Sequence, residues 1–151
     1  AIGQSDNAFT PLQLGGYLST IVNGGIRYEI HLLHKVRDFS SREDVVVSTP
    51  KVVSSFSLPD AHRLTVIEGM EQMVATSVEV SRYMRGVPVT VAAKPGTAQT
   101  GSKSTENGLF VCCAPSRNPE IVVVSVIERA GGGSYSAMSA GAVLEAYYKN
   151  K

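Results

Sequence analysis

Several kinds of segment are missing from this 151-residue sequence, and their absence excludes whole classes of protein. No apolar run approaches the ~20 residues that a helix needs to cross a bilayer, and no basic-then-apolar signal opens the chain. Fourteen basic residues are balanced by thirteen acidic ones and do not form a stripe, so nothing indicates nucleic-acid binding. If the protein works outside the cytoplasm, we expect its targeting segment or membrane anchor to precede this sequence.

Cysteine is scarce, and the other metal-binding residues do not cluster. Cys112 and Cys113 are adjacent, so on a strand their side chains would point to opposite faces and could hardly bridge each other. We interpret both as buried thiols and not as a redox pair. The histidines have no cysteines or carboxylates around them at ligand spacing, so we predict no metal site and no cofactor. These histidines are His31, His34 and His62.

The composition is that of a globular protein with a substantial core. Hydrophobic residues make up 43% of the chain and charged residues 18%. A chain of this length hides about 70% of the surface that its unfolded form exposes. No repeat or low-complexity segment divides the sequence, which predicts one compact unit over residues 1–151.

Three segments carry helix signals. Thr10 as N-cap, Pro11 in the first turn and Asn23-Gly24-Gly25 as a stop predict a helix over 11–22. A second helix is expected from Pro59 to about residue 75, and a C-terminal helix from Ser134 onward. The apolar stripe of the second helix is more typical of a core face than of a cofactor pocket. That stripe consists of Leu64, Ile67, Met70 and Val74.

Strand-like runs fill much of the remaining sequence. Two β-type runs cover residues 26–36 and 45–56. Three further strands are predicted at Val87–Ala93, Leu109–Ala114 and Ile121–Glu128. The links between these three are too short for parallel crossovers, so the strands should be antiparallel neighbours. The predicted fold class is α/β, in the form of an α+β layered unit whose small antiparallel sheet is flanked by helices.

Two short patterns match motifs of serine acyl-enzymes but fail on physical grounds. An S-x-x-K pair needs serine and lysine one turn apart on a helix. Pro50 separates Ser48 from Lys51 and the flanking valines favour strand, so we interpret Ser48 as a hairpin-turn residue. The triplet Ser5-Asp6-Asn7 precedes the cap at Thr10, where small polar residues are expected of any helix entry. The order of these motifs along the chain is also wrong.

A third pattern, Lys94-Pro95-Gly96-Thr97, agrees with its surroundings. It closes a predicted strand, and a polar loop follows it. Here the chain resembles the C-terminal half of the transpeptidase domain of penicillin-binding proteins, most nearly the class B, monofunctional type. The matching stretches occur in family order and cover nearly the whole chain. They are AIGQ, TPLQL, NGG, EGM, KPGTAQ, FVCCAPSRNPEIVVVSVIE and the glycine-rich turn before the last helix.

The resemblance implies a role for three residues of this pattern. Lys94 would add positive potential to the active-site cleft and bond the serine of an S-x-N motif, which favours proton transfer. The hydroxyl of Thr97 would bind the carboxylate of the substrate or β-lactam, and its backbone N–H would form half of the oxyanion hole. Such a donor can be worth ~3 kcal/mol in the acylation transition state. Gly96 would let the substrate backbone lie against the strand.

Pro95 is the point at which the sequence departs from the family pattern. The family usually has threonine or serine there, which supplies a second hydroxyl to the carboxylate, whereas proline has neither a hydroxyl nor an N–H. Losing a hydrogen bond to a charged group costs about 1.5–3 kcal/mol, or roughly ten- to a hundredfold in binding. Proline is tolerated on an edge strand, so we expect weaker binding and an intact fold.

The resemblance also implies what lies outside the sequence. The nucleophilic serine, its lysine and the S-x-N motif are expected upstream of Ala1, in the missing N-terminal part of the domain. The chain alone should therefore form no acyl-enzyme. The implied ligands are peptidoglycan stem peptides and β-lactams, and the implied location is the extracytoplasmic face of the bacterial cell membrane, through an upstream anchor.

Two other functions remain open at this stage. One is a non-catalytic member that keeps the fold as a scaffold or sensor, with Pro95 as a sign of relaxed selection. The other is a serine β-lactamase or D,D-carboxypeptidase of the same superfold, because fold alone does not choose the reaction.

Overall fold

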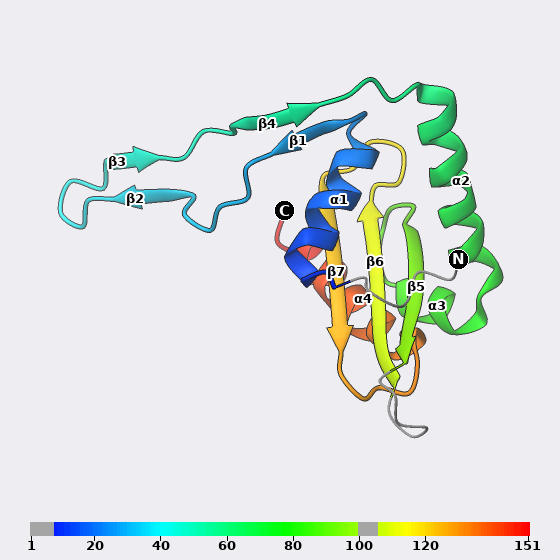
Figure 1. The fold of residues 1–151 in the computed structure, drawn as a ribbon. Coiled ribbons are helices and arrows are strands. Elements are labelled where there is room, and N and C mark those ends of the chain that lie inside the picture. Colours follow the sequence, from blue (N-terminus) through cyan, green and yellow to red (C-terminus); the bar gives the residue numbers. More distant parts are fainter. Residues whose placement is uncertain (1–7, 100–105) are drawn as a thin grey trace.

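The computed structural model describes residues 8–99 and 106–151, which form a layered body and a projecting arm (Figure 1). The helices are α1 (Pro11–Val22), α2 (Asp60–Thr76), α3 (Val78–Met84) and α4 (Gly133–Lys149). The strands are β1 (Ile26–Tyr28), β2 (Lys35–Arg37), β3 (Asp44–Val47), β4 (Val52–Ser55), β5 (Ala92–Gln99), β6 (Glu106–Ala114) and β7 (Ile121–Ile127). This mixed arrangement, with a small antiparallel sheet flanked by helices, confirms the predicted fold class.

The first helix begins and ends where its capping signals predict. The Thr10 hydroxyl accepts from the Gln13 N–H at 3.2 Å, and the Gln13 side chain accepts from the Thr10 N–H at 2.8 Å, which completes a capping box. Pro11 occupies the first turn, where its missing N–H costs no hydrogen bond. Asn23 caps the other end and turns the chain toward β1 by accepting from the Ile26 N–H at 2.9 Å.

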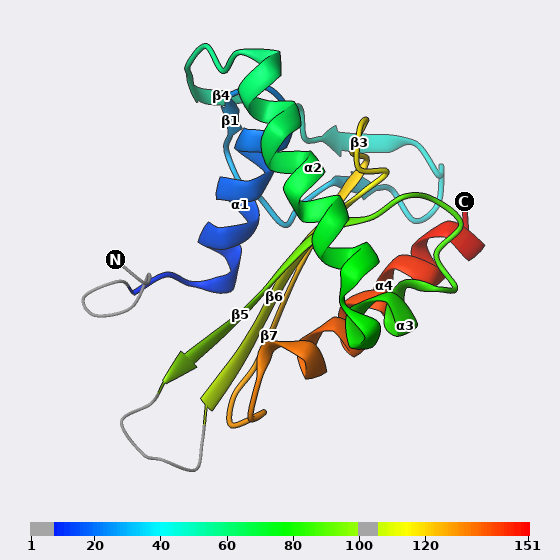
Figure 2. The same cartoon turned by 90° about the vertical axis from the view of Figure 1, so that its right-hand side faces the viewer.

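The central sheet has three antiparallel strands in the order β5-β6-β7. Figure 2 shows α1 and α2 on one face of this sheet and α3 and α4 on the other. Two apolar clusters correspond to these faces. The cluster toward α3 and α4 includes Val80, Met84, Ala93, Phe110, Cys112, Val123, Ala137, Ala140 and Leu144. The cluster toward α1 and α2 consists of Leu18, Val22, Ile67, Met70, Ala92 and Cys113.

The adjacent cysteines lie on opposite faces of β6, as the sequence predicted. Cys112 belongs to the cluster under α4 and Cys113 to the cluster under α1 and α2. Both are fully buried and reduced. Removal from water raises the pKa of the Cys112 thiol to about 12 and that of Cys113 to about 11. These thiols are therefore packing residues that hold their protons at neutral pH.

All three predicted helices are present in the structure. Ile67 and Met70 are buried core residues of α2, which confirms the core reading of its stripe. The short helix α3 was not predicted, because its seven residues are too few to show a clear period.

The strand that carries Lys94 lies later in the chain than predicted. We expected a strand over Val87–Ala93 that the pattern closes, but β5 begins at Ala92 and continues through Gln99. The partner strand β6 likewise begins at Glu106 and not at Leu109. Small residues and a proline have low strand propensity, but eight consecutive pairs with β6 override it. The pattern therefore lies in the middle of a strand.

The prediction that Ser48 is a hairpin-turn residue is wrong. Strands β1 to β4 form a long, interrupted two-stranded ribbon, which we call the arm, with β1 paired to β4 and β2 to β3. Ser48 lies between β3 and β4, which follow one another along the same side of the arm (Figure 1). The turn is at residues 38–43, where the Asp38 carboxylate accepts from the N–H groups of Ser40 and Ser41.

Candidate functional site

The candidate site is the outer edge of β5. Among the described residues β5 pairs only with β6, so its other edge is open. Lys94 lies opposite Val111 of β6, and Thr97 lies opposite Gly108. The predicted site residues are consecutive, so the structure places them together on this one edge strand.

The backbone orientation at this edge follows from Pro95. Proline has no N–H to donate, so its nitrogen faces away from the partner strand. The N and C=O of one strand residue point to the same side, and the Pro95 carbonyl indeed accepts from Lys94 Nζ at 2.9 Å. Orientation repeats every second residue, so the Thr97 N–H also points to the open edge. The edge thus offers an ammonium group and a backbone N–H donor.

Thr97 and Pro95 share one face of β5, because side chains two residues apart point the same way. This face is the one toward α4, since Thr97 Oγ1 accepts from the Gly133 N–H at 3.2 Å. Lys94 and Gly96 point to the opposite face. The Thr97 side chain therefore lies between the strand edge and the first turn of α4.

The backbone at the start of α4 packs directly against β5 and β6. An added Cβ at Gly133 would lie 2.4 Å from the Gly96 carbonyl oxygen, and one at Gly108 would lie 2.4 Å from that of Gly132. Such contacts leave no room for a side chain. The sequence places glycines 131–133 in a turn before the last helix but does not predict this contact. The signal was the run of three glycines directly before a helix.

The rejected serine motif does not approach β5. Ser48 Oγ donates to the Leu33 carbonyl at 2.5 Å within the arm. Lys51 pairs with Glu29 at 2.8 Å; this contact lowers the pKa of Glu29 and raises that of Lys51. The arm projects on the side of β7, away from β5 (Figure 1). Ser5-Asp6-Asn7 lies outside the described residues.

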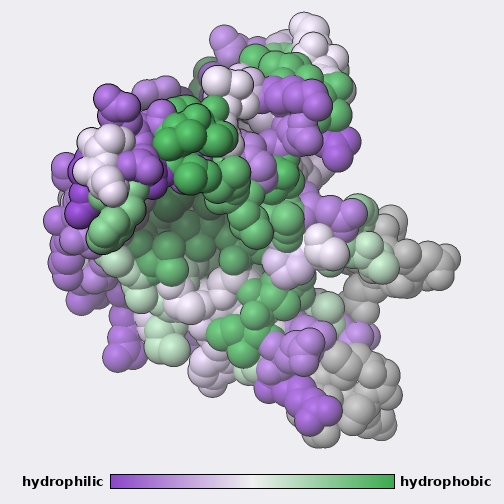
Figure 3. Space-filling model, turned by 90° about the vertical axis from the view of Figure 1, so that its left-hand side faces the viewer, coloured by the Kyte–Doolittle hydropathy of each residue, from purple (hydrophilic) through white to green (hydrophobic). Residues whose placement is uncertain are grey.

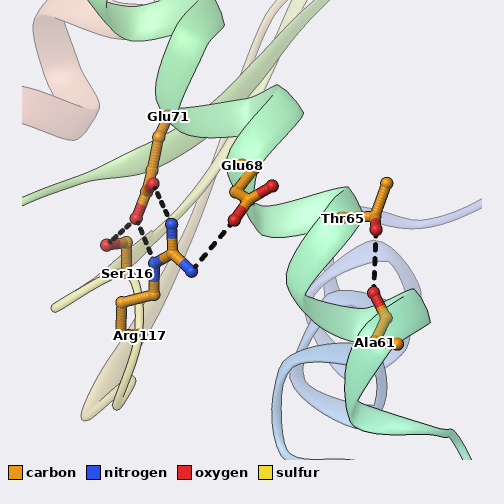
Figure 4. A network of polar contacts seen from close by, with 6 residues as sticks. All are labelled: Ala61, Thr65, Glu68, Glu71, Ser116 and Arg117. Atoms are coloured by element: carbon orange, nitrogen blue, oxygen red, sulfur yellow. Dashed lines mark hydrogen bonds and ion pairs between the residues drawn. The ribbon is translucent and has the colours of Figure 1, made fainter.

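A second polar cluster joins α2 to the turn between β6 and β7 (Figure 4). Arg117 donates to Glu71 from Nε at 3.0 Å and from Nη2 at 2.8 Å, and the buried Ser116 hydroxyl donates to the same carboxylate. The hydrogen bond from Arg117 is the main cause that lowers the pKa of Glu71. Glu68 makes a longer contact with Arg117, at 3.5 Å. The polar groups of this cluster bond to one another, so we interpret it as a structural contact that holds α2 to the β6–β7 turn.

An apolar hollow lies elsewhere on the molecule, between α1, the arm and β7 (Figure 3). Its volume is about 330 Å³, and Leu12, Tyr28, Ile30 and Val122 contribute to its walls. None of the residues from Lys94 to Thr97 lines it. The hollow is therefore separate from the β5 edge.

Comparison with known families identifies the type of domain. The model of the penicillin binding protein transpeptidase domain matches residues 1–149. The chain belongs to this family. The resemblance that the sequence motifs indicated is thereby confirmed.

Two characterised relatives indicate where the chain falls within the family. It is 35% identical over 141 residues to penicillin-binding protein 2A of Bacillus subtilis, covering 84% of this chain and 19% of the relative. It is 26% identical over 170 residues to the peptidoglycan D,D-transpeptidase PbpA of Mycobacterium tuberculosis, covering 97% of this chain and 30% of the relative. The chain thus spans less than a third of the length of either relative.

Solved structures agree with the fold. A ceftriaxone acyl-enzyme complex of penicillin-binding protein A from M. tuberculosis superposes with a TM-score of 0.80 at 24% identity, over 96% of this chain and 34% of that one. PBP2 of Pseudomonas aeruginosa in complex with WCK 5153 gives a TM-score of 0.73 at 27% identity, over 97% and 31%. Within residues 8–99 and 106–151, no helix has the length and apolarity to cross a membrane.

Proposed function

We propose that this chain is the C-terminal portion of a peptidoglycan D,D-transpeptidase domain and that its β5 edge forms one wall of the active site. The observation that carries the proposal is the arrangement of three groups: Lys94, the Thr97 N–H and the Thr97 hydroxyl lie together on the edge strand β5 of a penicillin-binding fold. A cation and hydrogen-bond donors along an edge strand suit a ligand that is itself extended and anionic.

The reaction assigned to the complete domain is acyl transfer. A serine of the complementary part of the domain attacks the carbonyl carbon of the penultimate D-alanine of a stem peptide. The C–N bond to the terminal D-alanine breaks, and that residue leaves as the free amine with the proton that the serine has lost. An amine of a neighbouring peptidoglycan chain then attacks the acyl ester. This step forms the cross-link, and the amine proton restores the serine hydroxyl. A β-lactam enters the same first step by opening its ring.

Three residues of the β5 edge have a role in the first step. The Thr97 N–H donates to the carbonyl oxygen as negative charge develops on it, and the Thr97 hydroxyl donates to the terminal carboxylate. The Lys94 ammonium raises the positive potential on the opposite face of the strand, where it favours loss of a proton by the neighbouring serine of an S-x-N motif. Gly96 keeps the strand accessible, because an added Cβ there meets only Leu109 Cβ, at 3.6 Å.

The proposal includes a location and ligands. The substrates are peptidoglycan stem peptides, and β-lactams are the inhibitors, in line with the acyl-enzyme complex of the M. tuberculosis relative. Because peptidoglycan is outside the cytoplasm, the domain works at the extracytoplasmic face of the bacterial membrane, held by an anchor outside this chain.

A fluorescent penicillin tests the proposal. The longer protein that contains this chain is expected to become covalently labelled, and the 151-residue chain alone is not. Labelling of the chain would overturn our rejection of Ser48 and Ser5 as nucleophiles. An unlabelled longer protein that folds normally would instead favour the non-catalytic scaffold, for which Pro95 is the supporting observation. Release of hydrolysed β-lactam at a steady rate would identify a β-lactamase.

A further inference from the structure

The first turn of α4 makes a hydrogen bond to the proposed carboxylate-binding residue, Thr97. Gly132 is the N-cap of α4 and makes no side-chain capping hydrogen bond. The Gly133 N–H, which would otherwise lack a partner, donates to the Thr97 hydroxyl at 3.2 Å. Thr97 therefore caps α4 from a different element, 36 residues away in the chain.

The direction of this hydrogen bond affects what Thr97 can do. A threonine hydroxyl has one proton to donate and two lone pairs that accept. The Gly133 N–H takes a lone pair, so the hydroxyl proton remains available. The α4 N-terminus also carries partial positive charge, which favours an anion at the same hydroxyl.

The backbone contacts hold this arrangement firmly. Gly133 is buried, and its Cα is so close to β5 that an added Cβ would lie 2.4 Å from the oxygen and 2.9 Å from the nitrogen of Gly96. The preceding turn is tied to β6, because the Gly131 N–H donates to the Glu106 carbonyl at 3.1 Å. The helix start therefore cannot move closer to β5, and the Gly131 hydrogen bond opposes its movement away from β6.

We propose that Gly133 is a positioning residue for the reaction: its N–H orients the Thr97 hydroxyl so that the hydroxyl proton points to the substrate carboxylate. This inference rests on the proposed function. It adds a residue outside the K-P-G-T pattern and assigns a substrate group, the carboxylate, to the contact.

The first test examines the contact in the chain itself, without any activity. Amide hydrogen exchange at Gly133 is measured by NMR in the wild type and in the Thr97→Val and Thr97→Ser variants. Thr97→Val is expected to speed exchange at Gly133 about tenfold, whereas Thr97→Ser, which keeps the hydroxyl, is expected to restore protection. Equal exchange in all three proteins would overturn the inference.

The second test uses the longer protein and a β-lactam in two forms, the free acid and its methyl ester. Gly133→Ala is expected to slow acylation by the free acid about tenfold more than acylation by the ester, because only the acid offers a carboxylate to Thr97. Gly132→Ala is the matched control, since an added Cβ there meets nothing within 4 Å. It is expected to acylate like the wild type.

The outcomes separate the two proposals. Equal slowing with acid and ester would give Gly133 a merely structural role and overturn this inference alone. If Gly133→Ala does not fold, the acid-to-ester comparison in Thr97→Val and Thr97→Ser decides: selective loss with valine and recovery with serine support the inference, and no selectivity overturns it. A wild-type protein that no β-lactam acylates would overturn the proposed function, and this inference with it.

Discussion

At the level of single residues, Pro95 and Thr97 lie two positions apart on the same face of β5, and only Thr97 carries a hydroxyl. Position 95 still contributes its carbonyl, which accepts from Lys94 Nζ. The proline therefore leaves the strand and its neighbouring ammonium in place while it removes one donor from the proposed carboxylate site.

Restoring that donor gives a prediction at this scale. In the longer protein, Pro95→Thr is expected to raise the second-order rate of β-lactam acylation roughly ten- to a hundredfold, because a hydrogen bond to a charged group contributes about 1.5–3 kcal/mol. Stopped-flow acylation kinetics measure this rate.

Pro95→Val is the matched control for this substitution. Valine has the branched shape and the N–H of threonine but no hydroxyl, so its acylation rate should stay near that of the wild type. An equal gain with valine would show that the proline ring, and not the missing hydroxyl, limits the reaction.

At the level of elements, the arm differs from the rest of the molecule in its burial. All residues of β2, β3 and β4 are exposed, and Leu32 in the arm is 98% exposed. Its polar contacts are internal: Asp44 pairs with Lys35 at 3.1 Å and Arg37 at 2.7 Å, which lowers the pKa of its carboxyl. The arm packs on the body near α1, where an added Cβ at Gly16 would lie 3.0 Å from Ile30 Cδ1. Its outer strands β2 and β3 hold their shape without such packing.

The outer part of the arm is accordingly expected to contribute little to the stability of the chain. Leu32→Ser and Val45→Thr should each change the free energy of unfolding by no more than about 0.5 kcal/mol. Phe110→Ala, at a fully buried site of β6, should cost about 3–5 kcal/mol. Urea unfolding followed by circular dichroism measures all three. A loss of more than about 2 kcal/mol in either arm variant would mean that the outer part of the arm packs on the body.

The sequence predicts elements well where the signal is local and poorly where it depends on pairing. The α1 boundaries follow from Thr10, Pro11 and Asn23, which act within one turn of the helix ends. The bounds of β5 do not follow from local signals, because Pro95 and Gly96 have low strand propensity and are held in the strand by pairing with β6.

In the candidate site, too, local signals were readable from the sequence and contacts between distant residues were not. Lys94 and Thr97 were found through a motif of consecutive residues. The Gly133 contact joins residues 36 apart and has no local pattern. A helical S-x-x-K pair was rejected at Ser48 because of Pro50, and Ser48 indeed lies between two strands. Its place along the arm depends on strand pairing that no local signal reveals.

At the level of the whole molecule, Glu71 makes a polar contact that joins α2 to the sheet. It receives hydrogen bonds from Ser116 and Arg117 and so fixes α2 to the end of β6. The pKa of Glu71 is lowered in the folded state from its ordinary value of 4.5, chiefly by Arg117. A depressed pKa means that the folded state binds protons less readily than the unfolded state.

The stability of the chain should therefore depend on pH through Glu71. Its contribution is fully present above pH 4.5 and is lost as the pH falls through the lower, folded-state pKa. At pH 7, Glu71→Gln is expected to lower the free energy of unfolding by about 1–3 kcal/mol. This difference from the wild type should shrink steadily below pH 4.5.

Glu68→Gln provides the control for the pH series. Its carboxylate is half exposed and contacts Arg117 only at 3.5 Å, so its removal should cost at most about 1 kcal/mol. Urea unfolding of the three proteins between pH 3 and pH 7 covers the relevant range. A Glu71→Gln penalty that stays constant across this range would show that the charge of Glu71 is not what stabilises the fold.

The adjacent cysteines of β6 lie in the two different apolar clusters, one on each face of the sheet. A thiol reagent can reach Cys112 only after α4 has parted from the sheet, and Cys113 only after α1 and α2 have done so. Reaction of each thiol with the reagent thus reports the opening of one face of the sheet and does not depend on the opening of the other. The reaction rates of these two neighbouring thiols should therefore report separately on the opening of the two faces of the sheet.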